Sequence, residues 1–158
     1  MFTAKSLADL PDHDAILAMS GLEFMQAVRA GKIARPPISV LLNYTLDTVE
    51  QGKVTFRGTP EFDHTNPMGG VHGGWYGTLL DSCMACAVMT VVPKGAAYTT
   101  LEYKVNLVRA IPLNMDIRAT GQIDHAGRST GVAHGEIRGA ERFDRLAAMN
   151  TGHDGSMT

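Results

Sequence analysis

The stretch NPMGGVHGGWYGTLLDS, residues 66–82, holds five glycines and then continues into an apolar segment of helical character. Glycine costs a helix interior about 1 kcal/mol relative to alanine, so glycines at a helix start need a reason. A helix N-terminus offers unpaired N–H groups and a partial positive charge, and glycine leaves those groups open to a ligand oxygen. The stretch predicts a helix over about residues 73–92, beginning either at an oxyanion or phosphate site or at a tightly packed end.

One carboxylate, Asp81, interrupts this predicted helix. It is the only acidic residue in 66–92, and an unpartnered carboxylate is costly to bury. Eight residues separate it from Gly73, which is ~12 Å along the helix and about 80° around its axis. Both groups of one chain therefore cannot act on one carbonyl, whereas two antiparallel copies of the helix related by a two-fold axis would bring them together. The spacing predicts a dimer with two composite sites.

The rest of the pattern predicts an α+β chain, with one long helix wrapped by an antiparallel sheet. Residues 1–35 predict a helical lead-in, in which Ser20 and Glu23 form a capping box and after which Pro36 and Pro37 end any helix. Strands are expected in segments rich in β-branched and aromatic residues; these segments are 41–49, 53–59, 97–111, 114–126 and 129–139, with a possible last strand in 142–150.

Length and composition set the outer limits. The 158 residues fit one domain, for which we expect an N-terminal extension over 1–35, a main domain over 36–150 and a loose tail over 151–158. The net charge of −2 argues against a nucleic-acid partner. The longest apolar stretch, 83–92, is about half a membrane span, and the first 20 residues lack a secretory signal. A soluble, cytoplasmic protein is expected.

Neither the histidines nor the two cysteines form a metal motif. The six histidines show no metal-binding spacing. Cys83 and Cys86 form a single C-x-x-C without a second pair. We expect them to be small, reduced core residues, with a redox role as the alternative, and we expect neither a metal nor another cofactor.

The pattern Asn66-x5-His72-Gly73-Gly74-x6-Asp81, followed by YTTLEYKVNLVRAI, resembles that of hotdog-fold acyl-coenzyme A thioesterases of the phenylacetic-acid-degradation (PaaI-like) type. The resemblance extends over roughly residues 20–148. It implies a hotdog fold, hydrolysis of acyl-CoA thioesters, and a homodimer or homotetramer.

The resemblance also implies roles for individual residues. Gly73 matches the residue whose N–H polarises the thioester carbonyl, and Asn66 the side chain that helps hold the carbonyl or water. Asp81 matches the acid that acts from the opposite subunit as general base or nucleophile, and Thr100 a hydroxyl that orients the attacking water. The substrate-binding positions that the resemblance implies are His72 and Gly74, beside the turn, and Arg128, near coenzyme A.

Two other functions stay open at this stage, and the acyl group is not readable from the sequence. A hotdog hydratase or dehydratase would use His72 and an acid for proton transfer. A non-catalytic acyl-CoA-binding protein would bind without turnover. The spacing from Asn66 to Asp81 resembles thioesterases more closely.

Overall fold

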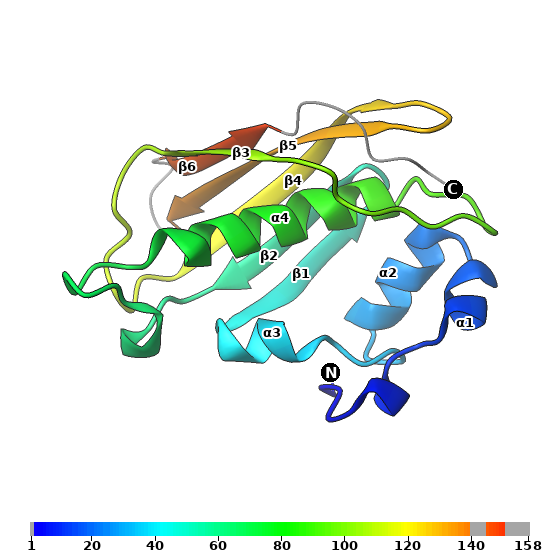
Figure 1. Ribbon diagram of the computed structural model, residues 1–158, viewed down its shortest axis with the longest axis horizontal. Coiled ribbons are helices and arrows are strands. Elements are labelled where there is room, and N and C mark those ends of the chain that lie inside the picture. The colour runs from blue at the N-terminus through cyan, green and yellow to red at the C-terminus, as the bar shows by residue number, and fades with distance from the viewer. Residues whose placement is uncertain (1, 140–144, 151–158) are drawn as a thin grey trace.

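A six-stranded antiparallel sheet lies behind one long helix, α4 (Gly73–Met89), in the computed structural model, which describes residues 2–139 and 145–150 (Figure 1). The strand order is β1-β2-β4-β5-β6-β3. The strands are β1 (Tyr44–Glu50), β2 (Lys53–Gly58), β3 (Lys104–Leu107), β4 (Ile117–Ala126), β5 (Gly131–Gly139) and β6 (Arg145–Asn150). The predicted α+β arrangement, with an antiparallel sheet around a central helix, is confirmed.

Short helices precede the sheet, and the last two of them lie beside β1 (Figure 1). They are η1 (Leu7–Asp9), α1 (His13–Leu17), α2 (Gly21–Arg29) and α3 (Pro37–Leu41), and a further turn, η2 (Phe62–His64), follows β2. The predicted capping box begins α2, since the Ser20 N–H donates to Glu23 Oε2 at 2.8 Å and the Glu23 N–H to Ser20 Oγ at 3.3 Å. The helical lead-in is therefore confirmed.

No helix runs into Pro36 and Pro37, since α2 ends at Arg29, but a new helix, α3, begins there, which was not expected from the sequence. Pro36 is the N-cap in an extended conformation, and Pro37 is the first helical residue. Proline fits the first helical position because its fixed φ suits a helix and its missing N–H would have no partner there anyway. The two prolines thus separate α3 from the preceding segment and also start it.

Helix α4 packs against the sheet over two glycines that face each other on neighbouring strands, Gly121 of β4 and Gly135 of β5. A Cβ at Gly121 would collide with the Cys83 carbonyl and lie 2.6 Å from the Met84 backbone N, and one at Gly135 would lie 2.9 Å from Met84 Cγ. The absent side chains let the helix approach the sheet closely.

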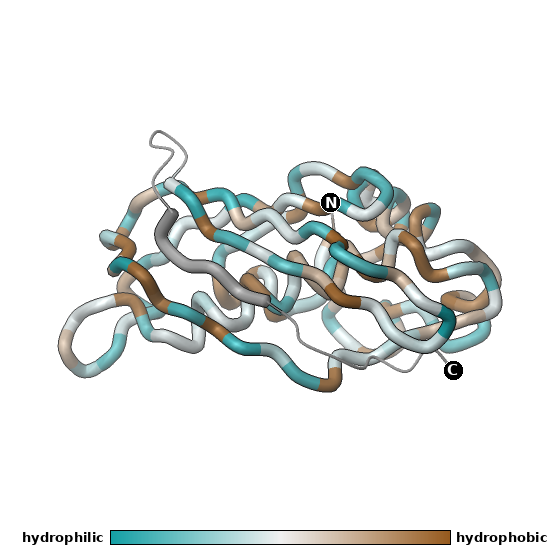
Figure 2. The backbone as a smooth tube through the Cα atoms, turned by 90° about the horizontal axis from the view of Figure 1, so that it is seen from above, coloured by the Kyte–Doolittle hydropathy of each residue, from teal (hydrophilic) through white to brown (hydrophobic). Residues whose placement is uncertain are grey.

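The core lies between α4 and the sheet. Hydrophobic and hydrophilic residues are interspersed along the backbone in Figure 2, and the first half of β4 alternates between buried and exposed positions. On β4, Ile117 and Ala119 are buried while Arg118 is exposed. The α4 residues Leu79, Leu80 and Cys83 are fully buried on the opposite side of this core.

Helix α4 ends at Met89, three residues before the predicted end. The Thr90 hydroxyl donates to the Ala87 carbonyl at 2.6 Å and accepts from the Gly52 N–H at 2.7 Å. These bonds tie the end of the helix to the β1–β2 turn, so the chain leaves α4 there.

The segment 97–111, expected to be one strand, forms a strand only over β3, which pairs with β6. Residues 96–103, which we term the strap, instead cross α4 on the side away from the sheet (Figure 1). The Tyr98 hydroxyl anchors the strap by donating to the Ala85 carbonyl at 2.6 Å. A segment that lies on a helix has no strand beside it to pair with, which explains the shorter strand.

The hairpin of β1 and β2 and the strands β4 and β5 agree with the prediction. The possible last strand is present as β6, while residues 142–144 of that prediction and the predicted tail 151–158 lie outside the described residues. Cys83 and Cys86 are free thiols, as expected, and burial raises the pKa of both.

Candidate active site

A tight turn precedes α4 and is held by the Asn66 side chain. Asn66 Oδ1 accepts from the N–H groups of Met68, at 2.9 Å, and Gly70, at 3.2 Å, and the Asn66 N–H donates to the Gly70 carbonyl at 2.8 Å. Gly69 has a φ of 79°, which favours glycine. Within the described residues, Asn66 Nδ2 has no hydrogen-bond partner, so this amide group can donate to a ligand.

His72 caps the N-terminus of α4. Its Nδ1 accepts from the Gly74 N–H at 2.9 Å, and its carbonyl accepts from the Trp75 N–H at 2.9 Å. The cap engages the Gly74 N–H, whereas the Gly73 N–H has no acceptor in the part of the chain that the structure describes. The helix therefore presents one open donor at its positive end, and the exposed His72 ring orients the turn.

Asp81 is a half-buried carboxylate in the middle of α4. Its Oδ1 accepts from the Thr100 hydroxyl of the strap at 3.3 Å. Burial raises the pKa of Asp81 above its ordinary value, and the Thr100 hydrogen bond partly offsets this by favouring the charged form. A carboxylate of raised basicity beside a hydroxyl suits proton transfer from water.

The strap and β3 run along α4 in the opposite direction. Thr100 contacts Asp81, while a Cβ at Gly77 would lie 3.8 Å from the Tyr103 hydroxyl and one at Gly73 would lie 3.3 Å from Leu107 Cδ1. These contacts place Gly73 and Asp81 at separate points of one helix, ~12 Å apart by the helical rise. The structure brings Thr100 to Asp81 and places the His72 cap next to Gly73, while Asn66 forms its hydrogen bonds within the preceding turn. It does not join Gly73 and Asp81 within one chain.

Arg128 lies apart from both groups. It is exposed at the tip of the β4–β5 hairpin, where the Gly127 N–H donates to the Thr130 carbonyl at 2.8 Å. The neighbouring Gly131 packs on Val88, near the C-terminal end of α4. The contact of Arg128 with coenzyme A, which the resemblance implies, stays a prediction.

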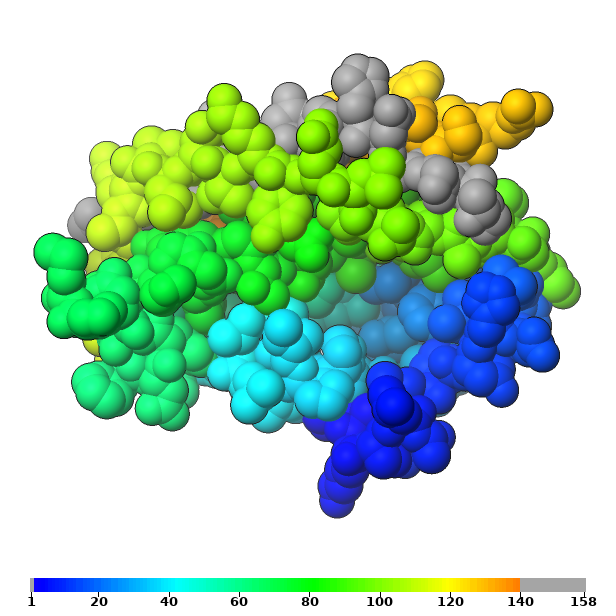
Figure 3. All heavy atoms as spheres, viewed as in Figure 1, coloured from blue at the N-terminus to red at the C-terminus, as the bar shows by residue number. Residues whose placement is uncertain are grey.

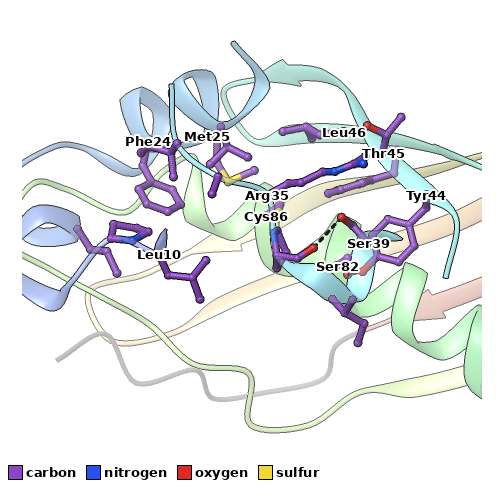
Figure 4. A pocket seen from close by; sticks show the side chains of 18 residues that line it. Leu10, Phe24, Met25, Arg35, Ser39, Tyr44, Thr45, Leu46, Ser82 and Cys86 are labelled. Carbon is purple, nitrogen blue, oxygen red and sulfur yellow. Dashed lines mark hydrogen bonds between the residues drawn. The ribbon is translucent and has the colours of Figure 1, made fainter. Parts of the chain in front are cut away.

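Sequence reasoning missed a cavity of about 370 Å³ whose lining includes Ser82, the residue after Asp81. Its size is usual for small-molecule sites. The hollow opens between α3, α4 and the N-terminal helices in Figure 3, and Figure 4 shows its side chains. The cavity is lined by Leu10, Pro11, Ile16, Phe24, Met25, Val28, Ile33, Ala34, Arg35, Pro36, Ile38, Ser39, Tyr44, Thr45, Leu46, Phe56, Ser82 and Cys86.

A hydroxyl pair joins two walls of this cavity. Tyr44 of β1 and Ser82 of α4 are hydrogen-bonded at 3.0 Å (Figure 4). Burial raises the pKa of Tyr44, and the negative charge of Asp81 adds to that effect. Ser82 follows Asp81 directly, 100° further around the helix, so the cavity and the Asp81 carboxylate lie at the same level of α4 on adjoining faces.

The described residues contain no cluster of three or more histidine, cysteine or acidic side chains arranged to hold a metal ion. In the same part of the chain, no helix is long and hydrophobic enough to cross a bilayer.

The family model of the Thioesterase superfamily matches residues 68–142, which include Asp81 and the start of α4. This match and the fold confirm the resemblance predicted from the sequence. The chain has a hotdog fold, as its structural neighbours do, and the matched segment supports a thioesterase enzyme. No curated protein sequence matches the chain.

Solved structures share the fold at low sequence identity. A phenylacetic acid degradation-related protein of Ralstonia eutropha JMP134 aligns with a TM-score of 0.74 and 20% identity, covering 85% of this chain and 99% of that one. The E. coli PaaI protein from the phenylacetic acid degradation operon aligns with a TM-score of 0.71 and 20% identity, covering 88% and 94%. A hypothetical thioesterase of Streptococcus pneumoniae TIGR4, in a structure with coenzyme A, aligns with a TM-score of 0.65 and 24% identity, covering 73% and 89%.

Proposed function

We propose that the protein hydrolyses acyl-CoA thioesters at a site shared between two copies of the chain. The observation that carries this proposal is the open Gly73 N–H at the start of α4 on the same helix as the half-buried Asp81. One group suits the developing oxyanion and the other suits the activation of water. The ~12 Å between them along one helix requires a second copy.

In this mechanism the thioester carbonyl accepts from Gly73 N–H, with Asn66 Nδ2 as a second donor. Asp81 of the other copy takes a proton from water, which Thr100 orients, as the water oxygen attacks the carbonyl carbon. The tetrahedral oxyanion then collapses, the C–S bond breaks, and the thiolate leaves with that proton as coenzyme A. Direct attack by Asp81 would instead give a mixed anhydride that water cleaves in a second step.

The open edge of the sheet supports the dimer. Among the described strands, β3 pairs only with β6, so its other side is unpaired. Leu101, Tyr103, Leu107 and Val108, which lie on or beside β3, are each about half exposed. Unpaired edges with apolar side chains are usually covered in solution. Pairing of β3 with its two-fold copy covers this edge; a homotetramer would require a further interface.

The acyl group occupies the cavity beside Ser82, which is apolar over most of its wall. Coenzyme A then lies outside the cavity. The resemblance assigns Arg128 a contact with coenzyme A and gives Gly74 and His72 a supporting role in substrate binding. The cytoplasmic location and the division at residues 35 and 150 remain predictions from the sequence.

The test measures thiol release from a panel of aromatic, medium-chain and branched acyl-CoA esters. We expect Asp81→Asn to lower kcat about a hundredfold or more, the usual scale for a lost base, without loss of the fold. Asp124→Asn is the matched control, because Asp124 pairs with His134 on the exposed hairpin at 2.6 Å. Near-normal turnover by folded Asp81→Asn would refute the assigned role.

The same assays separate the rival functions. A hydratase would change the absorbance of an enoyl-CoA ester without releasing thiol, and a binding protein would retain the esters without turnover. His72 is engaged through Nδ1 as the helix cap, which disfavours it as the proton-transfer group of a hydratase.

A further inference from the structure

Arg35 supplies the only charged side chain among the residues lining the cavity. Figure 4 shows this side chain extending toward Thr45 of β1. A second hollow of about 330 Å³ at the β1 edge shares Arg35, Ser39, Tyr44 and Thr45 with the cavity. Arg35 thus stands where the two spaces meet.

Contacts with the N-terminal segment hold the Arg35 backbone and stem. The Arg35 N–H donates to the Phe2 carbonyl at 3.0 Å, the Arg35 carbonyl accepts from the Ala4 N–H at 3.1 Å, and Arg35 Nε donates to Thr3 Oγ1 at 2.8 Å. These bonds use one of the five guanidinium N–H donors. The chain therefore fixes the position of this cation.

The charge of Arg35 is not neutralised by a neighbouring carboxylate. Within the described residues, no acidic side chain lies within 4.0 Å of its guanidinium, and the two Nη groups have no hydrogen-bond partner. Arg57, the other arginine of the second hollow, differs because its Nε lies 2.9 Å from Asp47 Oδ2. A half-buried guanidinium with open donors is suited to bind a carboxylate through paired hydrogen bonds.

We propose that the preferred substrates are acyl-CoA esters whose acyl group carries a second carboxylate, that is, monothioesters of dicarboxylic acids. This inference rests on the proposed function, since it requires the acyl group to enter this cavity. The methylene chain contacts the apolar walls from α2, β1 and α4, and the remote carboxylate pairs with Arg35. Arg35 is thereby a residue that determines specificity and takes no part in the bond-breaking step.

The test compares thioesters of equal chain length with and without the second carboxylate: adipyl-CoA against hexanoyl-CoA and suberyl-CoA against octanoyl-CoA. Wild-type protein should prefer at least one dicarboxylic ester. Arg35→Met, which keeps an apolar stem, should lower kcat/KM for that ester about tenfold to a hundredfold. It should leave hexanoyl-CoA and octanoyl-CoA within about threefold.

Arg57→Met is the matched control for charge removed from the second hollow, and it should leave the preference intact. No preference for either dicarboxylic ester, or an unchanged preference in Arg35→Met, would overturn the inference while leaving hydrolysis of the simple esters in place. If Arg35→Met weakened all four esters and inhibition by free coenzyme A equally, Arg35 would bind a coenzyme A phosphate and the inference would be wrong. If no ester released thiol, the proposed function and this inference would both fail.

Discussion

The composite site can be tested by mixing two inactive chains, Asp81→Asn and Gly73→Pro. Proline suits position 73 because it is the first helical residue. His72 before it already has ψ of 136°, the extended conformation that a following proline requires. The added Cβ meets only Leu107 Cδ1, at 3.3 Å, which is the end of a flexible side chain. Gly73→Pro therefore removes the N–H with little disturbance, and we expect it alone to lower kcat about a hundredfold to a thousandfold.

The shared-site arrangement also predicts how much activity the mixture of the two inactive variants regains. Random exchange of equal amounts of the two chains makes about half of the dimers heterodimers, and each heterodimer holds one intact site out of two. The mixture should therefore regain about one quarter of wild-type thiol release, after native mass spectrometry has shown the heterodimer. Gly73→Ala keeps the N–H and adds the same Cβ, so it serves as the matched control and should retain activity.

A second mixture separates a shared site from a site within one chain. Wild-type chain is exchanged with the double variant Asp81→Asn/Gly73→Pro. In a shared-site dimer both sites of this heterodimer are broken, whereas a site within one chain would leave one of them active. An inactive first mixture together with an active second heterodimer would refute the shared site and the reasoning from the ~12 Å separation.

Three further predictions follow from the same contacts. In the proposed mechanism Asp81 acts deprotonated, and its folded-state pKa is raised, so kcat/KM should fall on the acid side with a midpoint above the ordinary aspartate value. Thr100→Val removes a bond to the charged form and should move that midpoint to higher pH; a shift to lower pH would contradict this. Burial of the acyl chain should raise kcat/KM about fourfold for each added methylene, and Cys86→Phe, which fills the cavity, should reduce this increase. Turnover of acetyl-CoA, measured by thiol release, should stay within about threefold. An unchanged dependence of kcat/KM on chain length would count against the acyl cavity. Gly121→Ala should reduce the free energy of unfolding, measured in urea, by about 3 kcal/mol or more because its Cβ meets the backbone of α4. The control Thr120→Ala on the same strand loses the hydrogen bond to Thr55 and should reduce it by about 1 kcal/mol. Equal losses would be inconsistent with the close approach of α4 to the sheet.

The sequence predicted those structural elements that depend on residues close together in the chain. Ser20 and Glu23 stand three residues apart, and the capping box they form depends on little else. The glycine-rich turn and the start of α4 were likewise readable, since His72 and Gly73 lie in the sequence as they lie in the structure. The ~12 Å between Gly73 and Asp81 followed from helical geometry alone.

The features that sequence reasoning missed depend on distant contacts. The end of α4 at Met89 is set by the bond between Thr90 and Gly52, which are 38 residues apart. The strap has the composition of a strand, but its neighbour in space is a helix. The cavity could not be predicted because its walls come from separate helices and strands, and no short stretch of sequence encodes their meeting.

Under the proposed function, the cavity divides the chain into a segment that carries Gly73 and Asp81 and a segment that selects the acyl group. Sixteen of its eighteen lining residues precede residue 57, and only Ser82 and Cys86 come from the segment 68–142 that the family shares. Substitutions in the first third of the gene can thus alter which acyl group is accepted without touching Gly73 or Asp81. Exchange of residues 1–56 between relatives, in evolution or by engineering, is therefore expected to change the acyl preference and to leave the proposed hydrolytic residues as they are.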